Sequence, residues 1–156
     1  MVPKTRRKQS GFQVVDTATD IYWTVLAICI RMPKRYTDLV LDPIVSLAGE
    51  VMDEVIKGNS AIPNASAPDP TVVKIRKTHF TEALSSLEAL IQRMNFFIAN
   101  PNMIDHEIIG RSGTKIRVRV TEAQLIELAE LMRKEITLIR GTIKKDEERF
   151  NTGCKL

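Results

Sequence analysis

The stretch TEAQLIELAELMRKEITLIRGTIKKDEER (Thr121–Arg149) decides the fold. Thr121 and Gln124 have the spacing of a capping box, in which the two residues satisfy each other's backbone N–H groups at a helix start. The apolar residues that follow recur at intervals of three and four, the period of an amphipathic α-helix: Leu125, Leu128, Ala129, Met132, Ile136, Ile139 and Ile143. Acidic residues concentrate along the same segment: Glu122, Glu127, Glu130 and Glu135. A long apolar stripe must be buried, so this segment predicts a helical bundle.

Two preceding segments have the same helical period. One runs from about Pro70 to Ala99, with its stripe at Phe80, Ala83, Leu84, Leu87, Leu90, Ile91, Met94, Phe97 and Ile98. The other runs from about Thr37 to Gly58, with its stripe at Ile44, Leu47, Ala48, Val51 and Val55. Pro43 interrupts the second segment near its start. Either Asp42 caps a new helix with Pro43 at its first position, or one helix is kinked at Pro43.

The first helix is expected from about Asp16 to Arg31, capped by Asp16 or Thr17 and ended by Pro33. Ile21, Val25 and Ile28 form the stripe that should pack inward. Further apolar residues cover most of the remaining circumference, which is typical of a helix buried on more than one side. We therefore expect the other side to pack against a neighbouring subunit through Trp23, Leu26 and Ile30. The alternative is that segment 59–70 or segment 101–120 folds back over it.

Between the third and fourth helices, the stretch EIIGRSGTKIRVRV (Glu107–Val120) alternates apolar and basic residues around the turn sequence GRSG. This period of two predicts a β-hairpin, and the alternative is an extended loop. The predicted architecture is all-α: an up-down antiparallel four-helix bundle with a small β-hairpin or extended insertion. We expect a flexible basic arm over residues 1–14, the bundle over residues 15–150 and a C-terminal tail over residues 151–156.

The excess positive charge lies in the opening sequence MVPKTRRKQS, which holds Lys4, Arg6, Arg7 and Lys8 and no acidic residue. The whole chain has 23 basic and 19 acidic residues, so the remainder is formally neutral. A basic arm can attract phosphates or an acidic surface. The alternative is a disordered leader that only keeps the protein in solution.

Two further basic clusters lie in predicted connections. The first comprises Arg31, Lys34 and Arg35, and the second comprises Arg111, Lys115, Arg117 and Arg119 without interleaved acids. In an antiparallel bundle the first and third connections share one end, so we expect these clusters to gather there. The basic residues near 74–77 belong toward the other end. The alternative is ordinary solvated charge paired along each helix.

The sequence contains no recognisable catalytic constellation. His79 and His106 are the only histidines, and neither has the Glu-x-x-His spacing of bundle metal sites, because Arg76 and Met103 stand three residues before them. Asp53 and Glu54 are adjacent and are interpreted as part of a solvated face. No nucleotide-binding or nucleophile motif is present. We therefore expect no enzymatic activity, no metal and no cofactor.

Two observations bear on the cellular compartment. The strongest apolar stretch, IYWTVLAICI (Ile21–Ile30), has ten residues, whereas a membrane-spanning helix needs about 20. Cys29 and Cys154 lie far apart and form no disulfide framework, and Cys29 is expected to be buried on its helix. We expect a cytoplasmic protein with free thiols and no membrane association.

Three stretches resemble a known family. They are VPKTRRKQSGFQVVDTA, the run MPKRYTDLVLDPIVSLAGEVMDEVIKGNSAIP (Met32–Pro63) and the run LMRKEITLIRGTIKKDEERF. Together they are similar to the four-helix bundle proteins of bacteria and their phages. That group includes the accessory variability proteins (Avd) of diversity-generating retroelements and the proteins encoded in ribosomal RNA intervening sequences. The resemblance implies an up-down four-helix bundle.

For the accessory variability proteins, the resemblance further implies a homopentameric barrel that binds a reverse transcriptase and nucleic acid through basic surfaces. The function expected here is therefore that of a non-enzymatic accessory protein binding RNA or DNA beside a reverse transcriptase. Its nucleic-acid contacts would be the basic arm and the two basic clusters. The alternative function is a structural or protein-interaction module with no nucleic-acid role.

Overall fold

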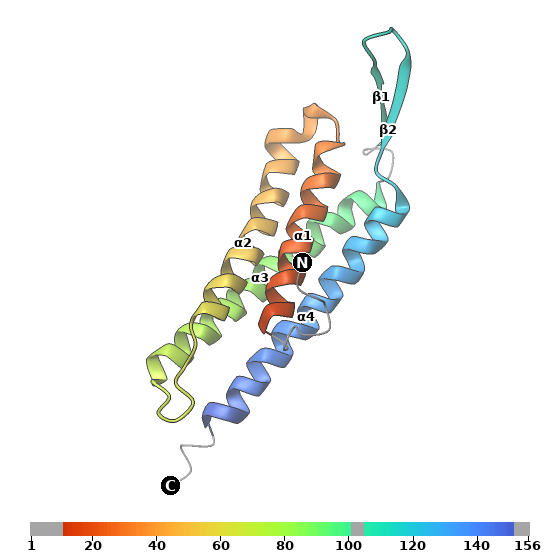
Figure 1. Cartoon of the computed structure of the whole chain (residues 1–156). Helices are drawn as coiled ribbons and strands as arrows, with labels where there is room; N and C mark the ends of the chain where they lie inside the picture. The colour runs from red at the N-terminus through yellow and green to blue at the C-terminus, as the bar shows by residue number, and fades with distance from the viewer. Residues whose placement is uncertain (1–10, 101–104, 152–156) are drawn as a thin grey trace, which may run out of the picture.

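The computed structural model describes residues 11–100 and 105–151 (Figure 1). Its helices are α1 (Gly11–Ile30), α2 (Asp42–Ser60), α3 (Pro70–Ala99) and α4 (Glu122–Asn151). They alternate in direction, and each packs against its two neighbours in the order α1, α2, α3, α4 and back to α1. The predicted all-α, up-down four-helix bundle is confirmed.

The core consists of the predicted stripes. Ile21, Val25 and Ile28 of α1 are completely buried, as are Val51 of α2 and Phe80 of α3. Each fully buried aliphatic side chain contributes about 1.5–3 kcal/mol, so the meeting of four stripes is sufficient reason for the helices to associate. Leu128, Met132 and Ile139 complete the core from α4.

The expected start of the first helix near Asp16 is wrong, because α1 begins at Gly11. Thr17 does not cap the helix, since its hydroxyl donates to the backbone oxygen of Gln13 at 2.8 Å within the helix. Val14 is completely buried. Burial of this residue in the bundle extends the helix beyond the point where the capping residues suggested that it would begin.

Pro43 acts on the segment before it. A 3₁₀ turn, η2 (Lys34–Tyr36), leads into a π-helical turn, η3 (Thr37–Leu41), and then into α2. The amide of Asp42 donates to the oxygen of Thr37, five residues earlier. Proline has no N–H to donate and its ring crowds the preceding turn, so a widened turn there is expected. Asp42 does not cap a new helix, because the backbone is already helical at Leu41.

The hairpin prediction is confirmed by strands β1 (Asp105–Ile109) and β2 (Lys115–Arg119), which pair antiparallel with Ile108 opposite Ile116. Gly113 has a φ of 75°, a conformation that favours glycine, and its amide donates to the oxygen of Gly110 at 2.9 Å. The hairpin projects beyond one end of the bundle (Figure 1). It therefore does not fold back over α1.

The capping box that opens α4 is also confirmed. The amide of Gln124 donates to the hydroxyl of Thr121 at 3.3 Å, and the amide of Thr121 donates to the side chain of Gln124 at 3.2 Å. The local sequence therefore sets the point where the hairpin ends and the last helix begins.

Candidate functional site

Exposed cations from two distant segments lie at one end of the bundle, where the α1–α2 connection and the hairpin are both found (Figure 1). Arg31 lies just beyond α1, and its guanidinium donates to the side chain of Gln124 in the first turn of α4 at 3.2 Å. We call this group the basic end. It comprises Arg31, Lys34, Arg35, Arg111, Lys115 and Arg117, all of them exposed.

Buried neighbours orient the cations of the α1–α2 connection. Met32 and Pro33 are buried at the end of the core, while the flanking Arg31 and Lys34 face solvent. The Arg35 guanidinium lies 4.9 Å from the centre of the Tyr36 ring. The connection is therefore anchored by its apolar residues and presents its charges outward.

Acidic residues lie opposite the hairpin cations across the strands, although none is interleaved with these cations in the sequence. The ammonium of Lys115 lies 3.7 Å from a carboxylate oxygen of Glu107, and the strand register places Glu107 opposite Arg117 and Asp105 opposite Arg119. Sequence spacing does not show the pair of Lys115 and Glu107, because it forms across the hairpin. Lys115 and Glu107 are both exposed, and such pairs contribute at most about 1 kcal/mol. A phosphate can therefore compete with Glu107 for Lys115.

Part of the predicted binding set lies outside the described residues. Lys4, Arg6, Arg7 and Lys8 precede Gly11, and the side chain of Arg119 is likewise not described. Their contribution to nucleic-acid binding stays a prediction.

The outward side of α1 is apolar at the positions predicted for an oligomer interface. Trp23 is 60% exposed and Ile30 is 75% exposed. Phe12, near the start of the helix, is exposed as well. Leu26 is half-buried. No described segment of the chain covers Trp23 or Ile30 in the way that the fold-back alternative required.

A polar cluster that sequence analysis missed joins α2 to α3. Nδ1 of His79 lies 2.6 Å from Oε2 of Glu54 and 3.6 Å from Oε2 of Glu82. Lys57 donates to the other oxygen of Glu54, Oε1, at 2.5 Å. We call Glu54, His79 and Glu82 the α2–α3 cluster. The interpretation of Glu54 as a solvated residue is wrong, because its side chain is largely buried against α3.

Two opposing effects act on Glu54. Burial raises the pKa of its carboxyl, but hydrogen bonds with Lys57 and His79 lower it, and the net shift is downward. Glu54 is therefore an ionised carboxylate at neutral pH. His79 and Glu82 have His-x-x-Glu spacing and share one helix face, a signal present in the sequence. Nothing in the spacing could have supplied Glu54 from another helix.

Glu135 is the clearest departure from the predicted pattern of α4. It is completely buried, and neither carboxylate oxygen has a hydrogen-bond partner. Burial raises the pKa of this carboxyl to about 8, although the nearby charge of Lys134 opposes the shift. Glu135 is therefore protonated in the folded protein at neutral pH.

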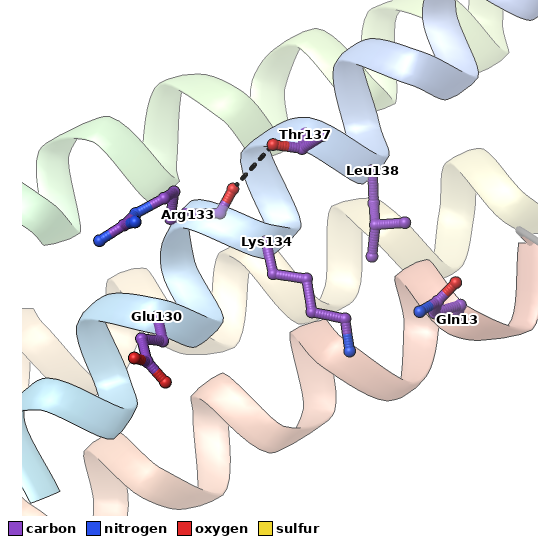
Figure 2. Close-up of a pocket in the computed structure, with 6 residues that line it drawn as sticks. All are labelled: Gln13, Glu130, Arg133, Lys134, Thr137 and Leu138. Atoms are coloured by element: carbon purple, nitrogen blue, oxygen red, sulfur yellow. Dashed lines mark hydrogen bonds between the residues drawn. The ribbon is translucent and has the colours of Figure 1, made fainter.

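A shallow groove of about 390 Å³ runs between α1 and α4 beside Lys134. In Figure 2, Lys134 extends from α4 toward α1, where Gln13 lies across the groove. Glu130, Arg133, Thr137 and Leu138 complete its lining. Charges of both signs line an open surface here, so the groove shows no preference for one class of ligand.

Ion pairs tie the helices together at the end opposite the hairpin. Nε of Arg76 lies 2.6 Å from a carboxylate oxygen of Asp146, and Nη1 of Arg76 donates to the backbone oxygen of Gly58 at 2.7 Å. Lys77 pairs with Glu147 at 2.7 Å. The basic residues near 74–77 therefore lie away from the basic end, as predicted, and two of them have structural partners.

No protein-family model, curated protein or solved structure matches this chain. Among the described residues, no helix is long and apolar enough to cross a membrane.

Proposed function

We propose that this protein is a non-enzymatic nucleic-acid-binding accessory protein that works as a homo-oligomer beside a reverse transcriptase. The observation that carries the binding part is the basic end, where exposed cations from two distant segments face solvent together. The reverse transcriptase rests on the resemblance to the accessory variability proteins, and the cytoplasmic setting rests on the two separate cysteines and the short apolar stretch of the sequence. The ligand is RNA or DNA, recognised through its phosphates.

The chemistry of the basic end supports contact with phosphates rather than with bases. Its cations are exposed, and the aromatic ring of its α1–α2 connection, Tyr36, is already in contact with Arg35. Phosphate contacts are independent of sequence and weaken steeply with salt. The basic arm before Gly11 would add four cations on each chain. In an oligomer these modest contacts would act together, which raises the overall affinity.

The test is a salt titration of RNA and DNA binding. We expect the triple variant Lys34→Ala, Arg35→Ala, Arg111→Ala to bind more weakly than the unmodified protein. The slope of log affinity against log salt should fall by about one for each phosphate that the variant no longer binds. A matched triple variant, Lys74→Ala, Lys144→Ala, Lys145→Ala, removes the same charge at exposed positions away from the basic end. It should keep most of the affinity.

The outcomes separate the possibilities. Equal losses in the two triple variants would mean that binding depends only on net charge. The absence of binding at low salt would exclude the nucleic-acid role. Co-purification with a reverse transcriptase encoded nearby tests the partner independently.

A second candidate function is a protein-interaction module with no nucleic-acid role. It is favoured by the pairing of Lys115 with Glu107 and by the exposed apolar side of α1. A pull-down with and without nuclease distinguishes the two functions. Partners that survive nuclease treatment would favour the interaction module, and partners that are lost would favour the nucleic-acid protein.

A further inference from the structure

The α2–α3 cluster brings one imidazole nitrogen and two carboxylates to a common point. One ligand atom from each of Glu54, His79 and Glu82 lies within 4.8 Å of the other two. Glu54 comes from α2, whereas His79 and Glu82 stand one helical turn apart on α3. The bundle itself therefore holds the three groups in position.

The arrangement offers more carboxylate oxygens to Nδ1 of His79 than a single ion pair uses. Nδ1 of His79 can carry one proton, yet carboxylate oxygens of both Glu54 and Glu82 face it. The carboxylates of Glu54 and Glu82 carry two negative charges, whereas Lys57 contributes one positive charge. A further cation at the common point would balance this charge and would bind the lone pair of Nδ1 in place of the proton.

We propose that Glu54, His79 and Glu82 form a zinc-binding site on the α2–α3 face of the bundle. Nδ1 of His79, Oε2 of Glu54 and Oε2 of Glu82 are the ligand atoms. This site is separate from the basic end and does not depend on the proposed nucleic-acid function.

The ligand set favours zinc over the common alkaline-earth ions. Zn²⁺ takes imidazole and carboxylate ligands at about 2.0–2.2 Å in a tetrahedral arrangement, whereas Mg²⁺ and Ca²⁺ prefer oxygen ligands alone. Tetrahedral ligands at that distance are about 3.3 Å apart. Glu82 is exposed, and a change in its side-chain torsions can bring its oxygen to this separation.

The surroundings of Glu54 also suit a metal ligand. Lys57 donates to Oε1 of Glu54, and Oε2 of Glu54 faces His79. Lys57 would therefore orient Glu54 as a ligand by a hydrogen bond, without binding the metal itself. Three protein ligands leave one tetrahedral position for water. The site lies at a half-exposed surface, so the ion can enter without any opening of the bundle.

Calorimetric titration of the chelator-washed full chain with ZnCl₂ tests this proposal. We expect saturable binding of about one zinc per chain at this site, and a rise in Tm with zinc that follows from binding to the folded state. Glu82→Gln should weaken zinc binding at least about 10-fold. Substitution of a residue that only hydrogen-bonds to a metal ligand typically costs at least this much, and Glu82 is itself a proposed ligand. The exposed position of Glu82 keeps this variant folded.

Two control variants test whether zinc binds elsewhere on the chain. Glu88→Gln changes another exposed glutamate of α3, paired with Arg140 at 3.7 Å, and should bind zinc like the unmodified protein. The double variant His106→Gln, Cys154→Ser removes the other histidine and the tail thiol, and should also retain binding.

His79→Gln, checked for unchanged helicity by circular dichroism, should lose binding as Glu82→Gln does. Zinc affinity that is the same in Glu82→Gln and Glu88→Gln would overturn the proposal. So would binding that disappears only in the double variant, and so would the absence of saturable binding in the unmodified chain.

Discussion

At the scale of single residues, the buried carboxyl of Glu135 makes the stability of the bundle depend on pH. The carboxyl has a pKa of about 8 in the folded protein against an ordinary value of 4.5. Between these values the folded state keeps a proton that the unfolded chain has released. The free energy of unfolding therefore falls as pH rises through this window, by about 1.4 kcal/mol per pH unit from this group. Below pH 4.5 Glu135 causes no loss in the free energy of unfolding, and above pH 8 the loss that it causes is constant.

We predict that Glu135→Gln removes this dependence. Urea unfolding at pH 5, 6, 7 and 8 should show the variant gaining stability relative to the unmodified protein as pH rises. Glu130→Gln is the matched control, because Glu130 lies on the more exposed side of the same helix and should leave the slope unchanged. Parallel stability curves for the unmodified protein and Glu135→Gln would contradict the assignment.

At the scale of elements, Arg76 fastens α3 to α4 and to the end of α2. Its side chain is 12% exposed, and it binds the carboxylate of Asp146 and the backbone oxygen of Gly58. Hydrogen bonds to charged groups contribute about 1.5–3 kcal/mol. We predict that Arg76→Ala lowers the free energy of unfolding by about 2 kcal/mol, measured by chemical denaturation.

The neighbouring pair provides the comparison. Lys77 and Glu147 are 58% and 45% exposed, so Lys77→Ala should cost less than about 1 kcal/mol. Arg76→Lys keeps the charge but loses the planar fork that reaches two partners, and its stability should be intermediate. Similar losses in the free energy of unfolding in Arg76→Ala and Lys77→Ala would show that Arg76 does not hold the helices together more strongly than an exposed ion pair does.

At the scale of the whole molecule, the outward side of α1 should decide the oligomeric state. Ile30 is exposed in the single chain, so Ile30→Glu leaves the bundle core intact. We predict by light scattering that the unmodified protein is an oligomer, a pentamer by resemblance, and that Ile30→Glu dissociates it without loss of helicity. Leu26→Glu should do the same, although Leu26 is half-buried within its own chain.

Ile62 provides the control for that experiment. It is 77% exposed in the connection between α2 and α3, and Ile62→Glu should leave the oligomer intact. Fluorescence of Trp23 provides a second measurement. The side chain is 60% exposed in one chain, so its emission maximum should shift to shorter wavelength when a neighbouring subunit covers it. A monomer at micromolar concentration would refute this interface.

Much of the fold follows from local sequence. The periods of α3 and α4, the Thr121–Gln124 capping box and the alternation in the hairpin are relations between residues within a few positions of one another. Local backbone geometry connects such residues, so the sequence predicts them without knowledge of the remaining chain. The gathering of Arg31, Lys34, Arg35 and the hairpin cations at one end follows from the antiparallel order alone.

Tertiary structure decided the rest, because the rotation of each helix about its axis is set by packing against its neighbours. That rotation places Glu54 of α2 against His79 of α3. It also buries Val14, which extends α1 back to Gly11. The strand pairing that sets Glu107 opposite Arg117 is likewise a relation between separate segments. Sequence spacing within one helix does not contain a contact such as that between Glu54 and His79, since it depends on which surfaces meet when the four helices associate.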